Sequence, residues 1–434
     1  MSGWVVILRL GAVQAAIGAM VMLATSLLNR VMVVELGLSA SIPAALVAWH
    51  YAVQFTRPLT GHASDRSGRR TPWILNGMAL LSLGSLAAVD AVASLAPGSA
   101  AALATLVAAF AMIGLGVGMA GTALLALLAA SVPPERRAAA AATTWILMVA
   151  GIAISAGVAG AMLQPFSLPR LASVSGGLVL IAFTLSLVAV LGVEHGVPRP
   201  VDAREQIPFG AALRAVKRDP EAVRFTLFVF LSMLAYSMQD LILEPFAGLI
   251  FGAAPGQSTQ YAGVQHGGVL VGMVIAGAGA GWLRKRGGPS LQWWTALGCL
   301  GSAAALSGLT GAAMVGPPWP LVPNIFLLGL ANGVFAAAAI GAMMELAGKD
   351  GSHRAGVRMG VWGAAQAFAF GLGGLTGAIA TDAARSLLGR DGPAFALTFA
   401  VEATLFLVAA VFAVRLPATG PKGDYQWSAS TPSS

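Results

Sequence analysis

Long apolar stretches of roughly 20 residues recur along almost the whole chain of 434 residues, separated by short polar connections. A helix rises about 1.5 Å per residue, so each stretch is long enough to cross about 30 Å of membrane hydrocarbon. Only a helix pairs every backbone polar group within such a segment. The pattern therefore predicts an all-α integral membrane protein with twelve transmembrane helices. We expect them at about residues 10–35, 41–60, 72–95, 100–129, 139–163, 171–193, 224–250, 262–283, 290–314, 321–346, 359–382 and 393–414.

The longest internal polar stretch divides these helices into two groups of six. The predicted organisation is an N-terminal six-helix half (1–195), a cytoplasmic linker (196–222), a C-terminal six-helix half (223–416) and a tail (417–434). An amphipathic stretch in the linker fits a helix lying on an anionic leaflet and fits a solvated connection equally well. The tail is rich in Gly, Pro, Ser and Thr, which predicts disorder.

The two halves show an internal repeat when the second is aligned on the first at an offset of about 210 to 217 residues. Parallel repeats of this kind relate the halves of transporter folds whose central site lies between them, near the middle of the bilayer. The aligned pairs are Asn29-Arg30 with Gln239-Asp240, His50 with His266, Gly61 with Gly277, Arg69-Arg70 with Lys285-Arg286, Gly114 with Gly329, and Trp145 with Trp362.

Composition and charge agree with membrane insertion and suggest its direction. The chain is 57% hydrophobic and only 10% charged, and its basic pI of about 10.4 reflects where the positive charges lie and not a nucleic-acid partner. Of the 25 Lys and Arg residues, only Arg170, Arg385 and Arg390 fall in connections on the predicted outer side. This bias predicts that both termini are cytoplasmic. The single cysteine, Cys299, excludes an internal disulfide and a cysteine-based metal cluster.

The connection after the second predicted helix carries a recognisable motif, GHASDRSGRR, from residue 61 to residue 70. It resembles the loop signature of the major facilitator superfamily, which implies the major facilitator fold. The residues that carry this resemblance to a gating motif are Gly61, Asp65, Arg66, Gly68, Arg69 and Arg70. A small residue permits close helix approach, the carboxylate bonds to a helix start or a basic residue, and the arginines anchor at headgroups. The alternative is a basic loop without a gating role.

Charged residues inside predicted helices invite a functional interpretation, because each costs at least about 2.5 kcal/mol to insert. The first helix contains Arg30 and Glu35, and the seventh contains Asp240 and Glu244, which at a spacing of four share a helix face ending at Pro245. We expect Arg30 to pair with Asp240 across the repeat, which leaves Glu244 or Glu35 for a ligand or a proton. The alternative is an ion-pair lock between the halves.

Two histidines, His50 and His266, are candidate axial ligands for the magnesium of a tetrapyrrole, because neutral imidazole coordinates metals. The alternative is that both are hydrogen-bonded helix residues. We expect no structural metal site. Further polar side chains expected to face the interior are Gln54, Gln239, Gln265, Asn332 and Gln366.

Four stretches carry a narrower resemblance: LNRVMVVELG, QDLILEPF, FLLGLANGVFAAAAIGAMM and RMGVWGAAQAFAFGLGG. They resemble the PucC/LhaA family of bacterial photosynthesis proteins, a branch of the major facilitator superfamily, and they span both halves. One departure is the compact loop after the second helix, where that family has an insertion; this departure points to a relative encoded with bacteriochlorophyll biosynthesis genes. The resemblance implies assembly of light-harvesting antenna complexes, with bacteriochlorophyll as bound ligand and no required cofactor.

The resemblance also implies partners and a location. The expected partners are antenna polypeptides, pigment-synthesis enzymes and membrane lipid, and the expected location is the bacterial inner membrane, cytoplasmic or intracytoplasmic. A competing function is proton-coupled transport of a small solute or pigment precursor, with Asp240, Glu244 or Glu35 titrating. A third, pigment synthesis by a prenyltransferase, needs closely spaced aspartates. Of nine aspartates only Asp382 and Asp391 lie within ten residues of each other, so we expect that the chain is not an enzyme.

Overall fold

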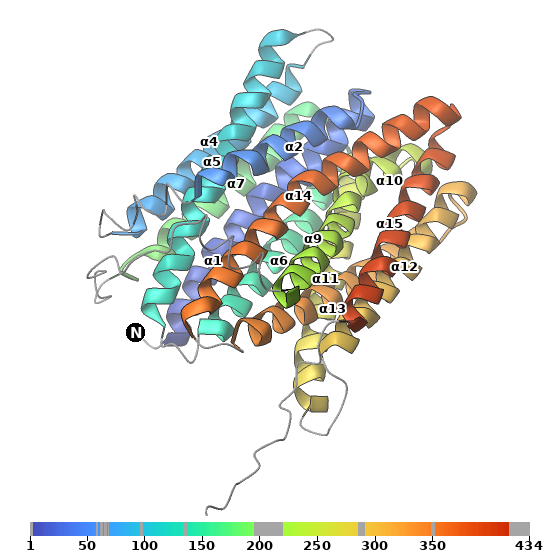
Figure 1. Cartoon of the computed structure of the whole chain (residues 1–434). Helices are drawn as coiled ribbons and strands as arrows, with labels where there is room; N and C mark the ends of the chain where they lie inside the picture. Colours follow the sequence, from blue (N-terminus) through green and yellow to red (C-terminus); the bar gives the residue numbers. More distant parts are fainter. Residues whose placement is uncertain are drawn as a thin grey trace, which may run out of the picture.

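A computed structural model describes residues 3–57, 60, 64, 67, 69–95, 99–132, 137–194, 220–284, 291–348 and 352–415. These residues are helical apart from turns and short connections (Figure 1). Within this described part, nine helices are long and apolar enough to cross a membrane. The structure thus agrees with the predicted all-helical, multi-pass membrane protein. The predicted linker up to residue 219, the predicted tail and most of the gating motif lie outside the described residues, and residues 220–222 of the predicted linker already belong to a helix.

The elements before residue 195 form the N-terminal bundle, drawn from blue to green in Figure 1. It contains α1 (Gly3–Met22), the π-helical segments η1 (Leu23–Leu28) and η2 (Val31–Glu35), α2 (Ser41–Val53), the 3-10 segment η3 (Gln54–Thr56), α4 (Thr71–Ala93), α5 (Ala100–Ser131), α6 (Arg137–Met162) and α7 (Leu168–Val190).

The elements after residue 219 form the C-terminal bundle, drawn from light green to red. It contains α9 (Pro220–Met238), the 3-10 segment η5 (Gln239–Leu241), α10 (Leu243–Phe251), α11 (Pro255–Arg284), α12 (Leu291–Val315), α13 (Leu321–Gly348), α14 (Ser352–Leu388) and α15 (Asp391–Arg415).

Local sequence explains where several helices begin and end. The side chains of Ser99 and Ser167 accept backbone N–H groups of the first turns of α5 and α7, each at 3.3 Å, which satisfies donors that a helix start leaves free. At the other end of α10, Gly252 adopts a φ of 66°, a left-handed conformation that glycine reaches without a Cβ penalty. Helix ends thus follow ordinary capping chemistry.

Buried hydrophobic side chains form two large clusters, one in each bundle. The first extends from Val6 to Val193 and also takes in Leu241, Ala262 and Ala378 of the C-terminal bundle, and the second extends from Phe228 to Ala413. Large apolar side chains on the outer surface, such as Leu180 and Ile181, are exposed. A soluble protein rarely exposes so many large apolar residues, whereas lipid contact removes the cost.

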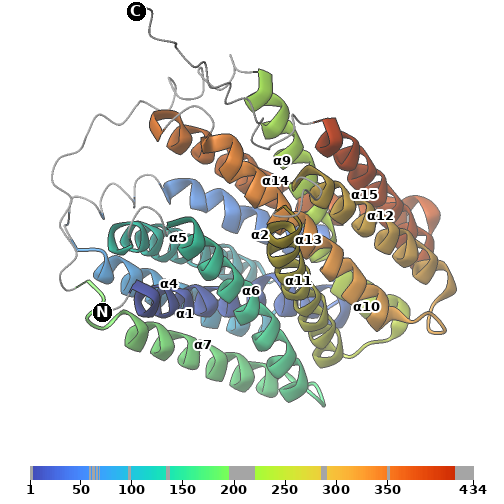
Figure 2. The same cartoon turned by 90° about the horizontal axis from the view of Figure 1, so that it is seen from below.

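The two bundles meet along two seams. In one seam α2 lies beside α14, and in the other α6 lies beside α11 (Figure 2). Glycines allow the second contact: a Cβ added at Gly160 would lie 2.5 Å from the carbonyl oxygen of Gly256, and one at Gly256 would lie 2.4 Å from that of Gly160. We call the end of the molecule where η2 stops and α15 begins the distal end, and the end that carries Gly3 the proximal end.

Two of the predicted continuous helices are irregular in the structure. The first leaves α-helical geometry at Leu23 and contains two π-helical segments, η1 and η2, separated by Asn29 and Arg30, and the seventh is interrupted by 3-10 geometry at η5. The prediction that Asp240 and Glu244 share one helix face is therefore wrong, because the chain between them is not continuous α-helix. Apolar periodicity does not record a change of hydrogen-bond pattern within a span.

Candidate functional site at the interface of the bundles

The irregular centres of the first and seventh spans touch each other. Asn29, between η1 and η2, donates its side-chain N–H to the backbone oxygen of Leu241 at 2.8 Å. The donor that would serve this oxygen in a regular helix belongs to Pro245, which has no N–H. A side chain of the N-terminal bundle therefore satisfies a carbonyl that proline leaves free in the C-terminal bundle. Broken helices at matching repeat positions are a feature of transporter sites.

The Arg30 side chain is only 2% exposed and is held by several acceptors. It donates to Glu35 at 2.9 Å, to the backbone oxygen of Ala253 at 2.6 Å and to Oγ of Ser258 at 3.1 Å. The last two acceptors belong to the C-terminal bundle. The prediction that Arg30 pairs with Asp240 is therefore wrong, because Arg30 forms its ion pair with Glu35. Arg30 connects the two bundles through the carbonyl of Ala253 and the hydroxyl of Ser258.

The space for this guanidinium depends on a glycine. A Cβ added at Gly248 would lie 3.0 Å from Nη2 of Arg30, so a side chain there would press on the charged group. The neighbouring Glu244 is 3% exposed, and one of its oxygens accepts from Thr259 at 3.2 Å. Its other oxygen has no hydrogen-bond partner among the described residues. Glu244 is therefore a half-satisfied carboxyl beside Arg30.

Asp240 belongs to a different group of side chains from Glu244. It lies close enough to Tyr51, Tyr236 and Glu402 to interact with each electrostatically. The ring of Phe370 lies between the two tyrosines, with centroids 6.1 Å from Tyr51 and 5.7 Å from Tyr236. These residues come from both bundles, so the group sits at their interface.

Glu402 is a member of this group that the sequence interpretation missed. It is 0% exposed on α15, and neither of its carboxylate oxygens has a hydrogen-bond partner in the described part of the chain. The neighbouring Gln239 is equally buried, and both of its amide atoms lack a partner there as well. A lone glutamate in the otherwise apolar stretch from 393 to 414 was the signal that could have found Glu402.

The two candidate histidines differ in what their ring nitrogens contact. Nε2 of His50 lies 2.8 Å from the amide nitrogen of Gln54, while the amide oxygen of Gln54 accepts from Arg57. Gln54 must therefore donate, and Nε2 of His50 accepts. His266 has the opposite arrangement: its Nδ1 lies 2.9 Å from the backbone oxygen of Ala262, so Nδ1 carries the proton and Nε2 keeps its lone pair.

The histidine positions also show how the repeat is packed. In the N-terminal bundle, a Cβ added at Gly114 would lie 2.4 Å from the backbone oxygen of His50. In the C-terminal bundle, one added at Gly329 would lie 1.9 Å from the backbone oxygen of Gln265, the residue before His266. Aligned glycines of the two bundles thus contact the backbone beside aligned histidines.

The remaining predicted polar residues are dispersed. Asn332 is buried inside the C-terminal bundle, where its oxygen accepts from Ser302 at 2.7 Å. Gln366 is half-buried on α14. The structure therefore brings Asn332 into contact with α12 and not with the irregular helix centres.

Four residues of the gating motif, Gly61, Asp65, Arg66 and Gly68, lie outside the described residues. At the end of the motif, the backbone N–H groups of Arg70 and Thr71 donate to the carboxylate of Glu194 at 2.5 and 3.0 Å. Partial burial raises the pKa of Glu194, but these hydrogen bonds outweigh it, so the pKa is lowered. Glu194 caps the start of α4, a role that the sequence interpretation did not assign.

Solved structures with the same fold are transporters. The chain matches the crystal structure of the D-xylose-proton symporter with a TM-score of 0.72 and 14% identity, over 96% of this chain and 98% of that one. It matches a bacterial homolog of the human lysosomal transporter Spinster with a TM-score of 0.66 and 15% identity, over 94% of each chain. The major facilitator fold is therefore confirmed, and identities this low support no more than the fold.

Two relatives correspond over nearly the whole chain. The chain is 49% identical, over 96% of both chains, to a Rhodobacter capsulatus protein named bacteriochlorophyll synthase 44.5 kDa chain. It is 29% identical to Protein PucC of Rhodobacter capsulatus, over 94% of this chain and 92% of that protein. The name of the first relative is that of an enzyme chain, so it contradicts the expectation that the protein is not an enzyme, and that expectation is corrected.

A family assignment follows from a match that covers most of the sequence. The family model described as PUCC protein matches residues 27–420, which include the C-terminal bundle and the N-terminal bundle from the end of η1 onward. This match agrees with the stretches that carried the resemblance in the sequence. The chain belongs to the PUCC protein family.

Proposed function

We propose that this chain is an assembly factor for photosynthetic light-harvesting complexes, which binds bacteriochlorophyll at the interface of its bundles and delivers it to antenna polypeptides. The observation that carries the proposal is the ring geometry of His266. Its Nδ1–H donates to a backbone carbonyl, so in the neutral imidazole the lone pair is on Nε2. Metal-binding histidines in proteins are held by this kind of second hydrogen bond.

The surroundings of His266 fit a large, flat ligand. The side chain is half-buried on α11, and at the adjacent Gly267 an added Cβ would meet nothing within 4 Å. A bound bacteriochlorophyll would supply the magnesium that takes an axial nitrogen ligand. His50 fits this role less well, because its Nε2 already accepts from Gln54.

The proposal includes a membrane architecture. The nine apolar helices, together with α2, α11 and α14, give twelve spans in two six-helix halves. Because the basic residues of the sequence concentrate in the connections on the side of both termini, we place both termini in the cytoplasm, so that the distal end faces outward. The membrane is the bacterial inner membrane. Pigment-synthesis enzymes are proposed partners, in keeping with the name of the relative called bacteriochlorophyll synthase 44.5 kDa chain.

The test is purification in mild detergent from a pigment-producing host. We expect bacteriochlorophyll to co-purify with the chain and with His50→Leu, and to be lost from His266→Leu. Each substitution replaces one imidazole by an apolar side chain at equivalent positions of the repeat. Each variant is therefore the control for the general effect of losing a histidine from a helix. A folded, pigment-free parent protein would overturn the proposal, and loss of pigment from His50→Leu alone would move the site to the N-terminal bundle.

A second candidate function is proton-coupled transport of a small solute or pigment precursor. The specific observation that favours it is the group formed by Asp240 and Glu402, two carboxyl groups within electrostatic reach of each other at the bundle interface. Buried carboxyl groups without partners inside a membrane protein mark ion and proton pathways.

The two functions are separated by proton movement in sealed vesicles. Solute-driven acidification that Glu402→Gln abolishes would support transport, because this change keeps the size and removes the exchangeable proton. No solute-dependent proton movement, together with bound pigment, supports assembly.

A further inference from the structure

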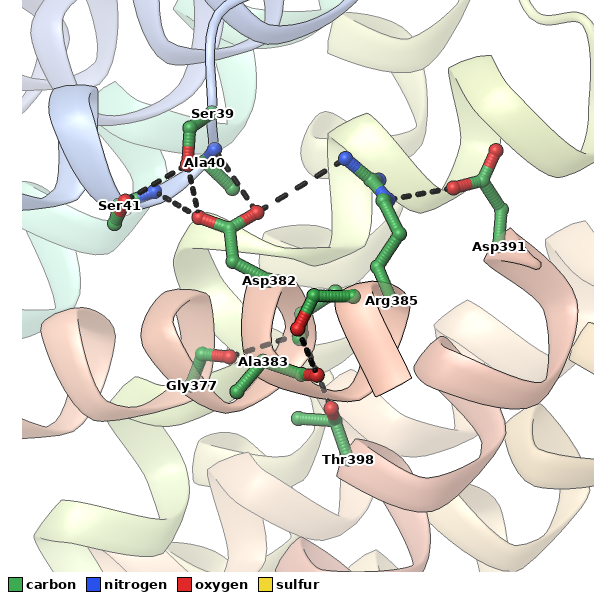
Figure 3. A network of polar contacts seen from close by, with 11 residues as sticks. Ser39, Ala40, Ser41, Gly377, Asp382, Ala383, Arg385, Asp391 and Thr398 are labelled. Carbon is green, nitrogen blue, oxygen red and sulfur yellow. Dashed lines mark hydrogen bonds and ion pairs between the residues drawn. The ribbon is translucent and has the colours of Figure 1, made fainter. Parts of the chain in front are cut away.

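Helix α2 begins without a cap from its own bundle. Its N-cap residue is Ala40, which has no side-chain hydrogen-bond acceptor, and the first N–H groups of a helix need such partners. The missing acceptor comes from Asp382 on α14. One oxygen of this carboxylate accepts from Ala40 N–H at 3.3 Å, and the other accepts from Ser41 N–H at 2.8 Å and from the hydroxyl of Ser39 (Figure 3).

The carboxylate is held from the C-terminal side. Arg385, one turn further along α14, lies 3.9 Å from Asp382 and 2.6 Å from Asp391 at the start of α15. In Figure 3 the guanidinium lies between the two carboxylates, so Asp382 has the charged Arg385 on one side and the helix start on the other. Both interactions favour a negative charge at this position.

A second polar tie crosses between the bundles at the same end of the molecule. Arg30 of the N-terminal bundle donates to the backbone oxygen of Ala253 and to Ser258, where α10 ends and α11 begins. Asp382 and Arg30 thus reach across the interface in opposite directions: one from the C-terminal bundle to α2, the other from the N-terminal bundle to α11. Both ties consist of hydrogen bonds to backbone or hydroxyl groups of the other bundle.

We propose that Asp382 is a gate residue whose carboxylate latches α2 to α14 and so keeps the distal end of the interface closed. Ligands then reach the interface only from the proximal end or from the lipid while the latch holds. This inference concerns access to the interface and goes beyond the proposed function, because it holds whatever ligand binds there.

A buried residue next to the latch provides a reporter. Ala378 lies one turn before Asp382 on α14, is 0% exposed and packs into the hydrophobic cluster of the N-terminal bundle. Cys299 is the single cysteine, so Cys299→Ala gives a background in which Ala378→Cys is the one thiol. A membrane-impermeant maleimide added to intact cells from which the outer membrane has been removed reaches this thiol only when α2 and α14 separate.

We expect Ala378→Cys to be labelled roughly tenfold faster when Asp382→Ala is added. This factor corresponds to the free energy that a helix loses with its N-cap. Asp391→Ala is the matched control, since Asp391 also binds Arg385 and begins a helix, but no hydrogen bond or ion pair joins it to the N-terminal bundle among the described residues. We expect it to leave the labelling rate within twofold of the parent. Unchanged labelling in Asp382→Ala, or an equal rise in both variants, would overturn the latch.

A further variant separates closure from helix stability. Ala40→Ser gives α2 a cap from its own chain, because serine is a favoured N-cap residue. Added to Asp382→Ala, it should restore thermal stability but leave the labelling fast. If Ala40→Ser also returned the labelling to the parent rate, Asp382 would be a helix cap only and the gate role would be wrong.

Discussion

At the scale of single residues, the interface depends on groups that reach from one bundle to backbone atoms of the other. Asn29 donates a hydrogen bond to the carbonyl of Leu241, and Arg30 donates one to that of Ala253. Asp382 accepts hydrogen bonds from the N–H groups at the start of α2. The partners in these contacts are backbone N–H and C=O groups, which every residue carries. A search for pairs of opposite charge in the sequence therefore does not find them. This is why the sequence pointed to Arg30 and Asp240 as partners.

The contact between Asn29 and Leu241 predicts a specific coupling. Asn29→Ala should destabilise the protein by about 1–3 kcal/mol, because it leaves a buried carbonyl without a donor. In Pro245→Ala the backbone N–H of residue 245 becomes available to the same carbonyl, so the cost of Asn29→Ala should fall. A double-mutant cycle on unfolding in detergent measures this, and strictly additive effects would show that Asn29 does not replace the missing N–H of proline.

Glu194 predicts a dependence on pH. Its carboxyl has a lowered pKa in the folded protein, so the stability that it contributes is present above the ordinary glutamate value of 4.5 and is lost as the pH falls through the folded value. Glu194→Gln should therefore lower the melting temperature at neutral pH, and the difference from the parent should shrink on acidification below pH 4.5. Asp90→Asn, an exposed change on the same helix α4, is the control for removing a carboxylate that caps no helix.

At the scale of elements, the seam between α6 and α11 depends on glycine. The carbonyl oxygens of Gly160 and Gly256 occupy the places that side chains would need, so the two helices cross with their backbones in contact. The irregular first and seventh spans adjoin this seam. A change in the distance between α6 and α11 should therefore weaken the hydrogen bonds that Asn29 and Arg30 make to the C-terminal bundle.

The seam gives a prediction about substitution by alanine. Gly160→Ala should push α6 away from α11 and lower the melting temperature by several degrees, because its Cβ would lie 2.5 Å from a backbone oxygen that cannot move by itself. Gly157→Ala, on the same helix, is the control, since its Cβ would meet nothing within 4 Å. Equal effects of the two substitutions would contradict close packing at Gly160.

Sequence reasoning reached the helical class, the multi-pass membrane character and the family, because apolar runs and stretches such as QDLILEPF carry this information directly. It did not reach the break at Gln239–Leu241, since 3-10 geometry leaves the apolar pattern unchanged. It also overlooked Glu402, and it treated Asp382 as the end of a predicted span and as one of two neighbouring aspartates, without a role at the interface. The roles of both residues depend on neighbours that are far away in the sequence. The period of apolar residues along one helix does not predict such neighbours.

At the scale of the whole molecule, two bundles enclose an interface that is tied at the distal end and carries polar side chains at its centre. Family membership and the ring geometry of His266 together support pigment handling in place of ordinary solute transport. In our proposals, the latch at Asp382 sets the side of access to the interface, and His266 binds the pigment. These two statements are independent, so a failure of one leaves the other standing.

The most direct measurement of the central claim is the coordination of magnesium by His266. Purified His266→Ala should bind bacteriochlorophyll at least tenfold more weakly than the parent, a loss of about 1.4 kcal/mol or more, and added imidazole should restore binding and the absorption band of ligated pigment. His50→Ala should bind like the parent and gain nothing from imidazole. Tight binding by His266→Ala with an unchanged band would contradict the account.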